Sequence, residues 1–274
     1  LILTSITMFH ISKFKIRGAR NDQNNTLDIT KIPFFPKYET KLIYQENLSI
    51  TWFEIGFSQS KYSYEECQNG SHACTLIAVI TAAKCHFGEV KIGLPQEHIN
   101  EQLVLALAHG MLLGNSIHED LKAKKTLSNY NLTIPQSLKY GKGHVRGLKE
   151  WFSELYAKTL QASLYENLKR QWQRWQQYCV SKNRSLKDLY VVLICDSRSV
   201  LFIFQSHSDT VSLIDSHRHS PTKGAFIATT SRVKLKLLCQ WFGDAIYKYH
   251  NSFPQLYELS YLYFKDISNY LITY

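Results

Sequence analysis

The sequence predicts an α+β protein in which helices come first and an antiparallel sheet follows. Helical periodicity dominates residues 74–113, and a two-residue period replaces it between residues 190 and 229. Short polar turns separate the strands of this second region, and strands joined by short turns must run antiparallel. The chain has 274 residues, 45% of them hydrophobic, which is enough for a sizeable core.

Three helices are expected in the first half of the chain. The first covers residues 74–87, where apolar residues recur on one face, and Ser71 is expected to cap its start. The second runs from about His98 to Leu113, where Gly114-Asn115 would end it. Pro135–Tyr140 has the pattern of a third, short helix.

Two further helices and a set of short strands are expected in the rest of the chain. Trp151–Cys179 carries a long helical pattern, which we interpret as a helical insertion at about residues 151–180. A last helix is expected over Ser231–Tyr249. The expected strands are Ser49–Ile55, Tyr190–Cys195, Ser199–Gln205, Thr210–Asp215 and Ala225–Thr229.

The domain organisation is simple. Residues 1–40 lack periodicity and are expected to form a peripheral or partly disordered arm, whereas residues 41–274 are expected to form one domain. The apolar stretches are shorter than the roughly 18 residues of a transmembrane helix. The six cysteines are dispersed, and the first residues lack the pattern of a secretory leader. We therefore expect reduced thiols in an intracellular protein, cytoplasmic or nuclear.

The charge and the motifs limit the classes of partner and cofactor. The net charge is +10, but the Lys and Arg are scattered. Their densest clusters, Lys13–Arg20 and Lys122–Lys125, do not interleave aromatic side chains as single-strand-binding grooves do, which does not favour nucleic acid as a partner. The sequence has no HExxH motif and no close cysteine pair, so we expect no metal and no cofactor.

Asp215-Ser216-His217 ends one of the expected strands. Side chains two residues apart on an extended strand point to the same side, so the carboxylate is placed to orient the imidazole ring. A neutral imidazole can take the proton of a nucleophile, and the carboxylate then stabilises the imidazolium. His207 and His219 are interpreted as bystanders.

Cys74 is the matching nucleophile because it begins an expected helix. The helix N-terminus supplies partial positive charge and free N–H groups, and both favour the thiolate. Cys67, in a polar loop, is the competitor. The cysteines interpreted as structural are Cys85, Cys179, Cys195 and Cys239.

An acyl-transfer site also needs donors for the oxyanion. The backbone N–H of Cys74 is one, and a side-chain amide is the other. Gln59 and Gln68 are both available. Gln59 is preferred because it follows a strand, 15 residues before Cys74, from where it can fold back beside the helix start.

Gln59, Cys74 and the Asp-x-His formed by Asp215 and His217, with a small apolar stretch after the histidine, resemble the herpesvirus large-tegument-protein deubiquitinases and their cellular and bacterial relatives. The resemblance covers residues 50–230 and implies a papain-like cysteine protease fold, with the nucleophile on a central helix packed on the sheet. It also implies hydrolysis after the C-terminal glycine of ubiquitin or a ubiquitin-like protein. By that analogy the cysteine is the nucleophile, the histidine the base, the aspartate its orienter and the glutamine the oxyanion donor. A serine follows the glutamine, where many viral members have glycine.

The same resemblance predicts acidic side chains along the substrate cleft, because the tail of ubiquitin is basic. The candidates are Glu54, Glu65, Glu66 and Glu119.

Two other functions are compatible with some of these residues. A metal hydrolase would use Asp215 with the pair His217 and His219, but too few residues follow for the eight-stranded barrel that such a pair opens in amidohydrolases. A catalytically inactive module would keep the fold and bind ubiquitin, or bind nucleic acid through its basic charge. The order of Cys74, Asp215 and His217 favours the enzyme.

Overall fold

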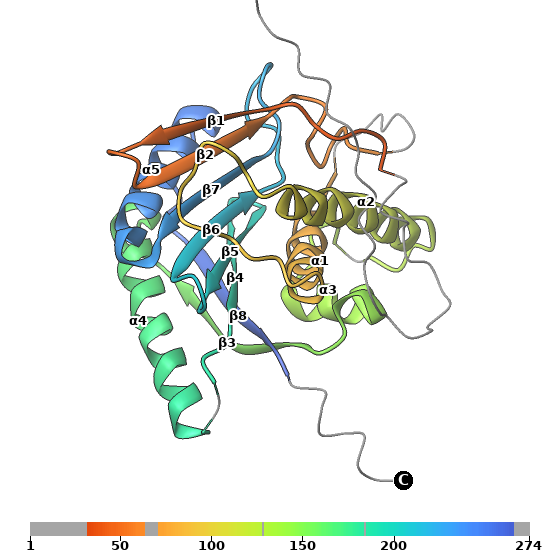
Figure 1. The fold of residues 1–274 in the computed structure, drawn as a ribbon. Coiled ribbons are helices and arrows are strands. Elements are labelled where there is room, and N and C mark those ends of the chain that lie inside the picture. The colour runs from red at the N-terminus through yellow and green to blue at the C-terminus, as the bar shows by residue number, and fades with distance from the viewer. Residues whose placement is uncertain (1–31, 64–70, 128, 184, 266–274) are drawn as a thin grey trace, which may run out of the picture.

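The computed structural model describes residues 32–63, 71–127, 129–183 and 185–265 (Figure 1). Within them, an antiparallel sheet forms the centre, with its strands in the order β1-β2-β7-β6-β5-β4-β8-β3. The strands are β1 (Tyr38–Ile43), β2 (Leu48–Phe53), β3 (Leu148–Tyr156), β4 (Leu189–Cys195), β5 (Arg198–Gln205), β6 (Thr210–Asp215), β7 (Phe226–Ser231) and β8 (Tyr257–Phe264). The α-helices are α1 (Cys74–Phe87), α2 (Glu101–Ala123), α3 (Ile134–Gly141), α4 (Leu160–Ser181) and α5 (Leu235–His250), with short 3-10 segments at Lys142–Val145 and Arg232–Lys234.

Two helical layers cover the two faces of the sheet (Figure 1). α1, α2 and α3 share a hydrophobic core with sheet residues such as Val192 and Ile214. α4 and α5 pack on the opposite face, over residues such as Val191 and Leu213. Because helices bury both faces, each central strand is apolar at consecutive positions instead of alternating with polar residues.

The predicted α+β fold class and its antiparallel meander are confirmed. β4, β5, β6 and β7 follow one another as antiparallel neighbours. α1 packs on the sheet beside β5, where the Thr75 hydroxyl lies 2.9 Å from the Ser199 hydroxyl. The predicted layout, with Cys74 at the start of a central helix that packs on an antiparallel sheet, is therefore present.

α1 and α2 approach closely because α2 presents two glycines to α1. A Cβ atom at Gly110 would lie 2.1 Å from Thr81 Oγ1, and one at Gly114 would lie 2.6 Å from Ile77 Cγ1. No side chain fits at either position unless the helices separate. α2 does not end at Gly114-Asn115, as predicted, but continues to Ala123. Glycine serves here in helix packing and not in helix termination.

The predicted helix over Trp151–Cys179 is wrong in its first part. Leu148–Tyr156 is strand β3, which pairs with β8 at the edge of the sheet, and α4 begins only at Leu160. The partner strand comes much later in the chain, so local sequence gives no sign of the pairing. α4 then packs with α5 over the sheet.

The N-terminal boundary of the sheet also differs from the expected one. β1 and β8 are strands that the sequence patterns do not predict. β1 begins at Tyr38, so residues 38–40 of the expected arm pair with β2. Residues 32–37 of the arm are also described, and the Phe34 carbonyl accepts the Tyr62 hydroxyl at 2.8 Å, whereas residues 1–31 lie outside the described part of the chain.

We expect Gly114→Ala to destabilise the protein by about 1–3 kcal/mol, because its methyl group would overlap Ile77. In an unstrained helix the same change stabilises by about 1 kcal/mol, so the sign of the effect is diagnostic. Urea denaturation measures the free energy of unfolding. Gly143→Ala is the matched control, because a Cβ there meets nothing within 4 Å. A Gly114→Ala protein as stable as the parent would contradict the close contact of α1 with α2.

Candidate active site

Cys74 is the first residue of α1, and no side chain caps this helix. The N-cap is Ala73, so the prediction that Ser71 is the N-cap is wrong. The Ser71 hydroxyl lies two residues too early and instead accepts the N–H of Ala73 at 3.1 Å. Because no side chain caps α1, no capping group competes for the N–H groups of its first turn. A helix start of this kind favours negative charge.

His217 and Asp215 lie at the end of β6 and contact each other. The His217 Nδ1 atom lies 2.6 Å from Asp215 Oδ1, and the backbone N–H of His217 donates to the same oxygen at 2.9 Å. The His217 ring and the Cys74 thiol also lie close enough for each to shift the pKa of the other. The structure thus brings Cys74, His217 and Asp215 together in the order thiol, imidazole, carboxylate.

The electrostatics of these groups favours charge separation between sulfur and imidazole. Burial raises the pKa of the Cys74 thiol, but His217 and, to a smaller extent, Ser199 together outweigh burial and hold that pKa below its usual value. Burial lowers the pKa of His217, yet the Asp215 carboxylate and Cys74 raise it to about 10. Burial would raise the pKa of Asp215, while His217 and His219 hold it well below its usual range. These shifts favour a thiolate beside an imidazolium.

Gln59 connects the segment before α1 to the turn that carries His217. Its Nε2 atom donates to the Ser71 carbonyl at 2.9 Å, and its Oε1 atom accepts the Ser216 hydroxyl at 2.7 Å. Its backbone N–H donates to the Ser216 carbonyl, and its own carbonyl accepts from Asn115 Nδ2, both at 2.7 Å. The side-chain amide is therefore held in one orientation close to both catalytic segments.

Gly224 holds the loop that carries Gln59 against the start of β7. Its N–H donates to the Phe53 carbonyl at 2.9 Å, and the N–H of Ala225 donates to the Phe57 carbonyl at 2.8 Å. A Cβ at Gly224 would lie only 2.4 Å from the Phe57 oxygen, so a larger residue would push the loop away.

The β4–β5 turn covers the sulfur of Cys74, which the sequence did not indicate. Asp196 and Ser197 form this turn with φ angles of 45° and 60°, the backbone geometry of a tight two-residue hairpin. The Ser197 carbonyl lies 4.0 Å from Cys74 Sγ, and the Asp196 carboxylate accepts the Ser252 hydroxyl. Cys74 is only 5% exposed. The sequence predicts a turn at this position, but its contact with Cys74 follows from the register of β4 and β5 in the sheet, which the sequence does not reveal.

His219 contacts the carboxylate that orients His217, although we interpreted it from the sequence as a bystander. Its Nε2 atom lies 3.3 Å from Asp215 Oδ2, and its Nδ1 atom lies 3.0 Å from His250 Nε2. It follows the end of β6, where the alternation of strand side chains no longer predicts direction. His207, the other expected bystander, lies exposed in the β5–β6 turn.

The acidic residues predicted to line a substrate cleft lie in different parts of the chain. Glu54 follows β2, and its carboxylate accepts the backbone N–H of Lys37 at 2.7 Å. Glu119 is exposed on α2, one turn beyond the residue that contacts Gln59. Glu65 and Glu66 lie outside the described residues. No measured contact joins Glu54 or Glu119 to Cys74.

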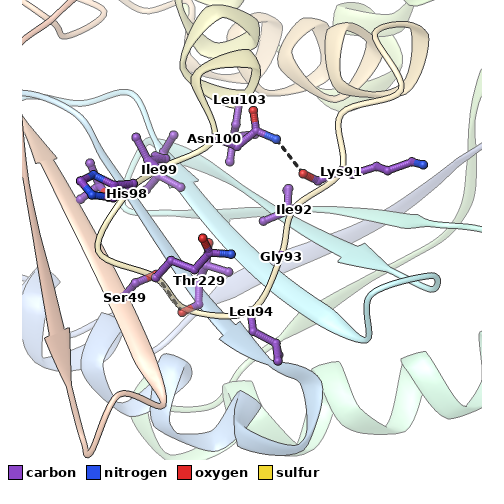
Figure 2. A pocket seen from close by; sticks show the side chains of 13 residues that line it. Ser49, Lys91, Ile92, Gly93, Leu94, His98, Ile99, Asn100, Leu103 and Thr229 are labelled. Atoms are coloured by element: carbon purple, nitrogen blue, oxygen red, sulfur yellow. Dashed lines mark hydrogen bonds between the residues drawn. The ribbon is translucent and has the colours of Figure 1, made fainter.

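A separate pocket lies between the loop that leads into α2 and the strands β2 and β7 (Figure 2). It encloses about 290 Å³, with Ser49 and Thr229 on the sheet side. Asn100 Nδ2 donates to the Lys91 carbonyl at 2.7 Å and closes the loop at its base. The lining residues include none of the catalytic candidates, so this pocket is distinct from the site at Cys74.

In residues 32–63, 71–127, 129–183 and 185–265, no three His, Cys, Asp or Glu side chains are grouped so as to hold a metal ion. Over the same ranges, no helix has both the length and the apolar character that crossing a membrane requires.

No family model and no curated protein matches this chain. The solved structures similar to it include the following two. The ubiquitin-specific protease of a murine cytomegalovirus tegument protein, in complex with a ubiquitin-based suicide substrate, matches at 13% identity and a TM-score of 0.45, over 80% of this chain and 88% of its own. The Pseudomonas avirulence protein AvrPphB matches at 10% identity and a TM-score of 0.38, over 70% of this chain and 91% of its own. Sequence identities and TM-scores this low carry no argument about function.

We expect iodoacetamide to alkylate Cys74 before the other cysteines. His217 lowers the pKa of Cys74. As the pH is lowered, the alkylation rate of Cys74 should therefore begin to decrease at a lower pH than the alkylation rate of free cysteine, whose pKa is about 8.5. Burial raises the pKa of Cys195 to about 12 and also raises those of Cys85 and Cys239, which should react slowly. Peptide mass spectrometry identifies the modified residue.

Cys67, which lies outside the described residues, is the control for this experiment. Cys67→Ser should leave the fast phase intact, and Cys74→Ser should abolish it. Fast labelling that persists in Cys74→Ser, or a Cys74 profile identical to that of a free thiol, would contradict the proposed thiolate.

Proposed function

We propose that the chain is a cysteine protease that hydrolyses the bond after the C-terminal glycine of ubiquitin or a ubiquitin-like protein. The supporting observation is that Cys74, at the start of α1, and His217 shift the pKa of each other, and that the His217 ring lies 2.6 Å from the Asp215 carboxylate. A low-pKa thiol, an imidazole and an orienting carboxylate are the groups that acyl transfer requires. The choice of ubiquitin comes from the resemblance of the motif residues.

In the proposed first step, the Cys74 thiolate attacks the carbonyl carbon of the terminal glycine, and the carbonyl electron pair moves to oxygen. The His217 imidazolium then gives its proton to the departing amine, the C–N bond breaks, and a thioester remains. In the second step His217 takes a proton from water as the water attacks the thioester carbon, the C–S bond then breaks, and the terminal glycine leaves as a carboxylic acid while the sulfur leaves as thiolate. The proton returns to the sulfur or stays on the imidazole, and Asp215 holds the ring throughout.

The developing oxyanion has two proposed donors. One is the backbone N–H of Cys74, at a helix start that no side chain caps. The other is Gln59, whose amide nitrogen carries two hydrogens and donates one of them to the Ser71 carbonyl. Its hydrogen bond from Ser216 fixes which end of the amide carries the N–H groups.

Entry of the substrate requires a rearrangement of the β4–β5 turn. The Ser197 carbonyl lies against the sulfur, so an extended tail has to displace this turn to reach Cys74. Asp196 of the same turn then offers a carboxylate to a basic residue of the tail. We retain Glu54, Glu65, Glu66 and Glu119 as further proposed contacts for the tail.

One observation favours the alternative of a catalytically inactive ubiquitin-binding module. Cys74 is 5% exposed, and the side chain of His217 is 13% exposed, so the site is covered in this conformation. A binding module would keep this cover closed, whereas a protease must open it. The following experiment separates the two functions.

A ubiquitin that carries a thiol-reactive group at its C-terminus should form a covalent adduct with this protein. The adduct should disappear in Cys74→Ala, persist in Cys67→Ala, and form at least about tenfold more slowly in His217→Ala, because the imidazole activates the sulfur. Gel shift and intact mass measure it. If Cys74 reacts with iodoacetamide but never with the ubiquitin probe, the hydrolase has a different substrate or the chain is a binding module.

Asp196→Asn should raise KM for a ubiquitin substrate about fivefold and leave kcat within about twofold, because one surface charge pair is worth about 1 kcal/mol. Asparagine tolerates the positive φ of this position, so the turn should persist. Asp209→Asn is the matched control: it changes another turn aspartate with positive φ, at the far end of β5. Equal KM values for Asp196→Asn and the parent would contradict a contact between this carboxylate and the tail.

A further inference from the structure

We propose that His219 is a positioning residue: its Nε2 atom presents a proton to the Asp215 oxygen that His217 leaves open, and His250 fixes the tautomer that makes this possible. The inference rests on the roles proposed above for Cys74, His217 and Asp215. It does not depend on ubiquitin as the substrate.

The two oxygens of Asp215 have different partners. Oδ1 accepts from the ring and from the backbone N–H of His217. Oδ2 faces His219 Nε2 at 3.3 Å. Asp215 is 1% exposed, and a buried carboxylate is costly unless hydrogen-bond donors surround it. His219 is placed to supply the donor on the open side.

The surroundings of His219 Nε2 leave this atom no better partner. The side chain is 1% exposed, and Nε2 has no hydrogen-bond partner among the described residues. Its 3.3 Å contact with Asp215 Oδ2 is therefore an electrostatic contact with a charged carboxylate, without the alignment of a good hydrogen bond. A bare nitrogen lone pair facing this carboxylate would be repelled, so the proton belongs on Nε2.

His250 selects that tautomer from the other side of the ring. Its Nε2 atom lies 3.0 Å from His219 Nδ1, so one of the two nitrogens must donate and the other accept. Burial, with Arg198 and His219 nearby, lowers the pKa of His250 to about 4, so it is neutral at physiological pH. With its proton on Nε2, His250 donates to His219 Nδ1, which leaves His219 Nε2 as the donor that faces Asp215.

Aromatic side chains fix the plane of the His219 ring. Trp52 and Phe226 lie with their ring centroids 5.2 Å and 4.9 Å from it, and Tyr249 lies at 5.9 Å. These contacts exclude water and restrict rotation, which is what a positioning residue requires. The titratable and charged groups around the ring are Asp215 and His217 from the end of β6, His250 and Tyr249 from α5, Lys223 before β7, and Arg198 from β5.

His219 affects the ionisation of the Cys74 thiol indirectly, by way of Asp215 and His217. A donor to the charged carboxylate favours its ionised form, and the ionised carboxylate stabilises the His217 imidazolium. The imidazolium in turn stabilises the Cys74 thiolate. Loss of the donor from His219 should therefore lower the fraction of thiolate at a given pH.

The test compares His219→Phe with His219→Gln by the rate of Cys74 alkylation with iodoacetamide from acidic to alkaline pH. Phenylalanine keeps the ring volume in the aromatic surroundings but has no donor, whereas glutamine places an N–H group near the position of Nε2. We expect His219→Phe to shift the rate profile about one pH unit upward, which is about tenfold at a fixed pH on the acidic limb. His219→Gln should stay within about twofold of the parent.

His207→Phe, a change of an exposed turn histidine, is the matched control and should not shift the profile. Thermal unfolding of each variant shows that it is folded. Parental rates in His219→Phe would overturn the proposal, as would a His219→Gln protein as slow as His219→Phe, because packing and not the donor would then matter. A shifted profile in a protein that never reacts with the ubiquitin probe would support the positioning role and reject the proposed substrate.

Discussion

The site depends on the buried carboxylate of Asp215. A charge in this position is costly, and its cost is offset only because imidazole rings face it on both sides. Its field, together with Cys74, raises the pKa of His217 to about 10, and the imidazolium lowers the pKa of Cys74 despite burial of the sulfur. Without the carboxylate, burial would favour the neutral thiol and the neutral ring, and the nucleophile would be lost.

The position of the sulfur depends on helix packing rather than on the site alone. Gly110 and Gly114 let α2 lie directly against α1, and β5 supports α1 from the sheet side. Asn115, next to the second glycine, binds both Ser71 and the backbone of Gln59. The same helix–helix contact therefore places the nucleophile and one proposed oxyanion donor. Stability and chemistry are linked here, since a shift of α2 would move both.

Local sequence predicted the parts of the site that depend on a single element. Cys74 at a helix start and Asp215 and His217 at a strand end were identified because short-range patterns define those ends. The features that it missed arise between elements. The β4–β5 turn over the sulfur and the contact of His219 with Asp215 depend on strand register and on α5, which no local pattern encodes. For the same reason β3 was mistaken for helix, since its partner β8 lies at the far end of the chain.

The protonation state of the His217 ring tests the thiolate–imidazolium pair most directly. Imidazole ¹⁵N chemical shifts, followed over pH in the parent and in Cys74→Ala, report it. We predict that the parent ring stays doubly protonated well above the usual histidine pKa of about 6.5, toward a pKa of about 10, and that this pKa falls when the sulfur is removed. A parent ring that is already neutral at slightly alkaline pH, or a pKa that the sulfur does not affect, would contradict the pair.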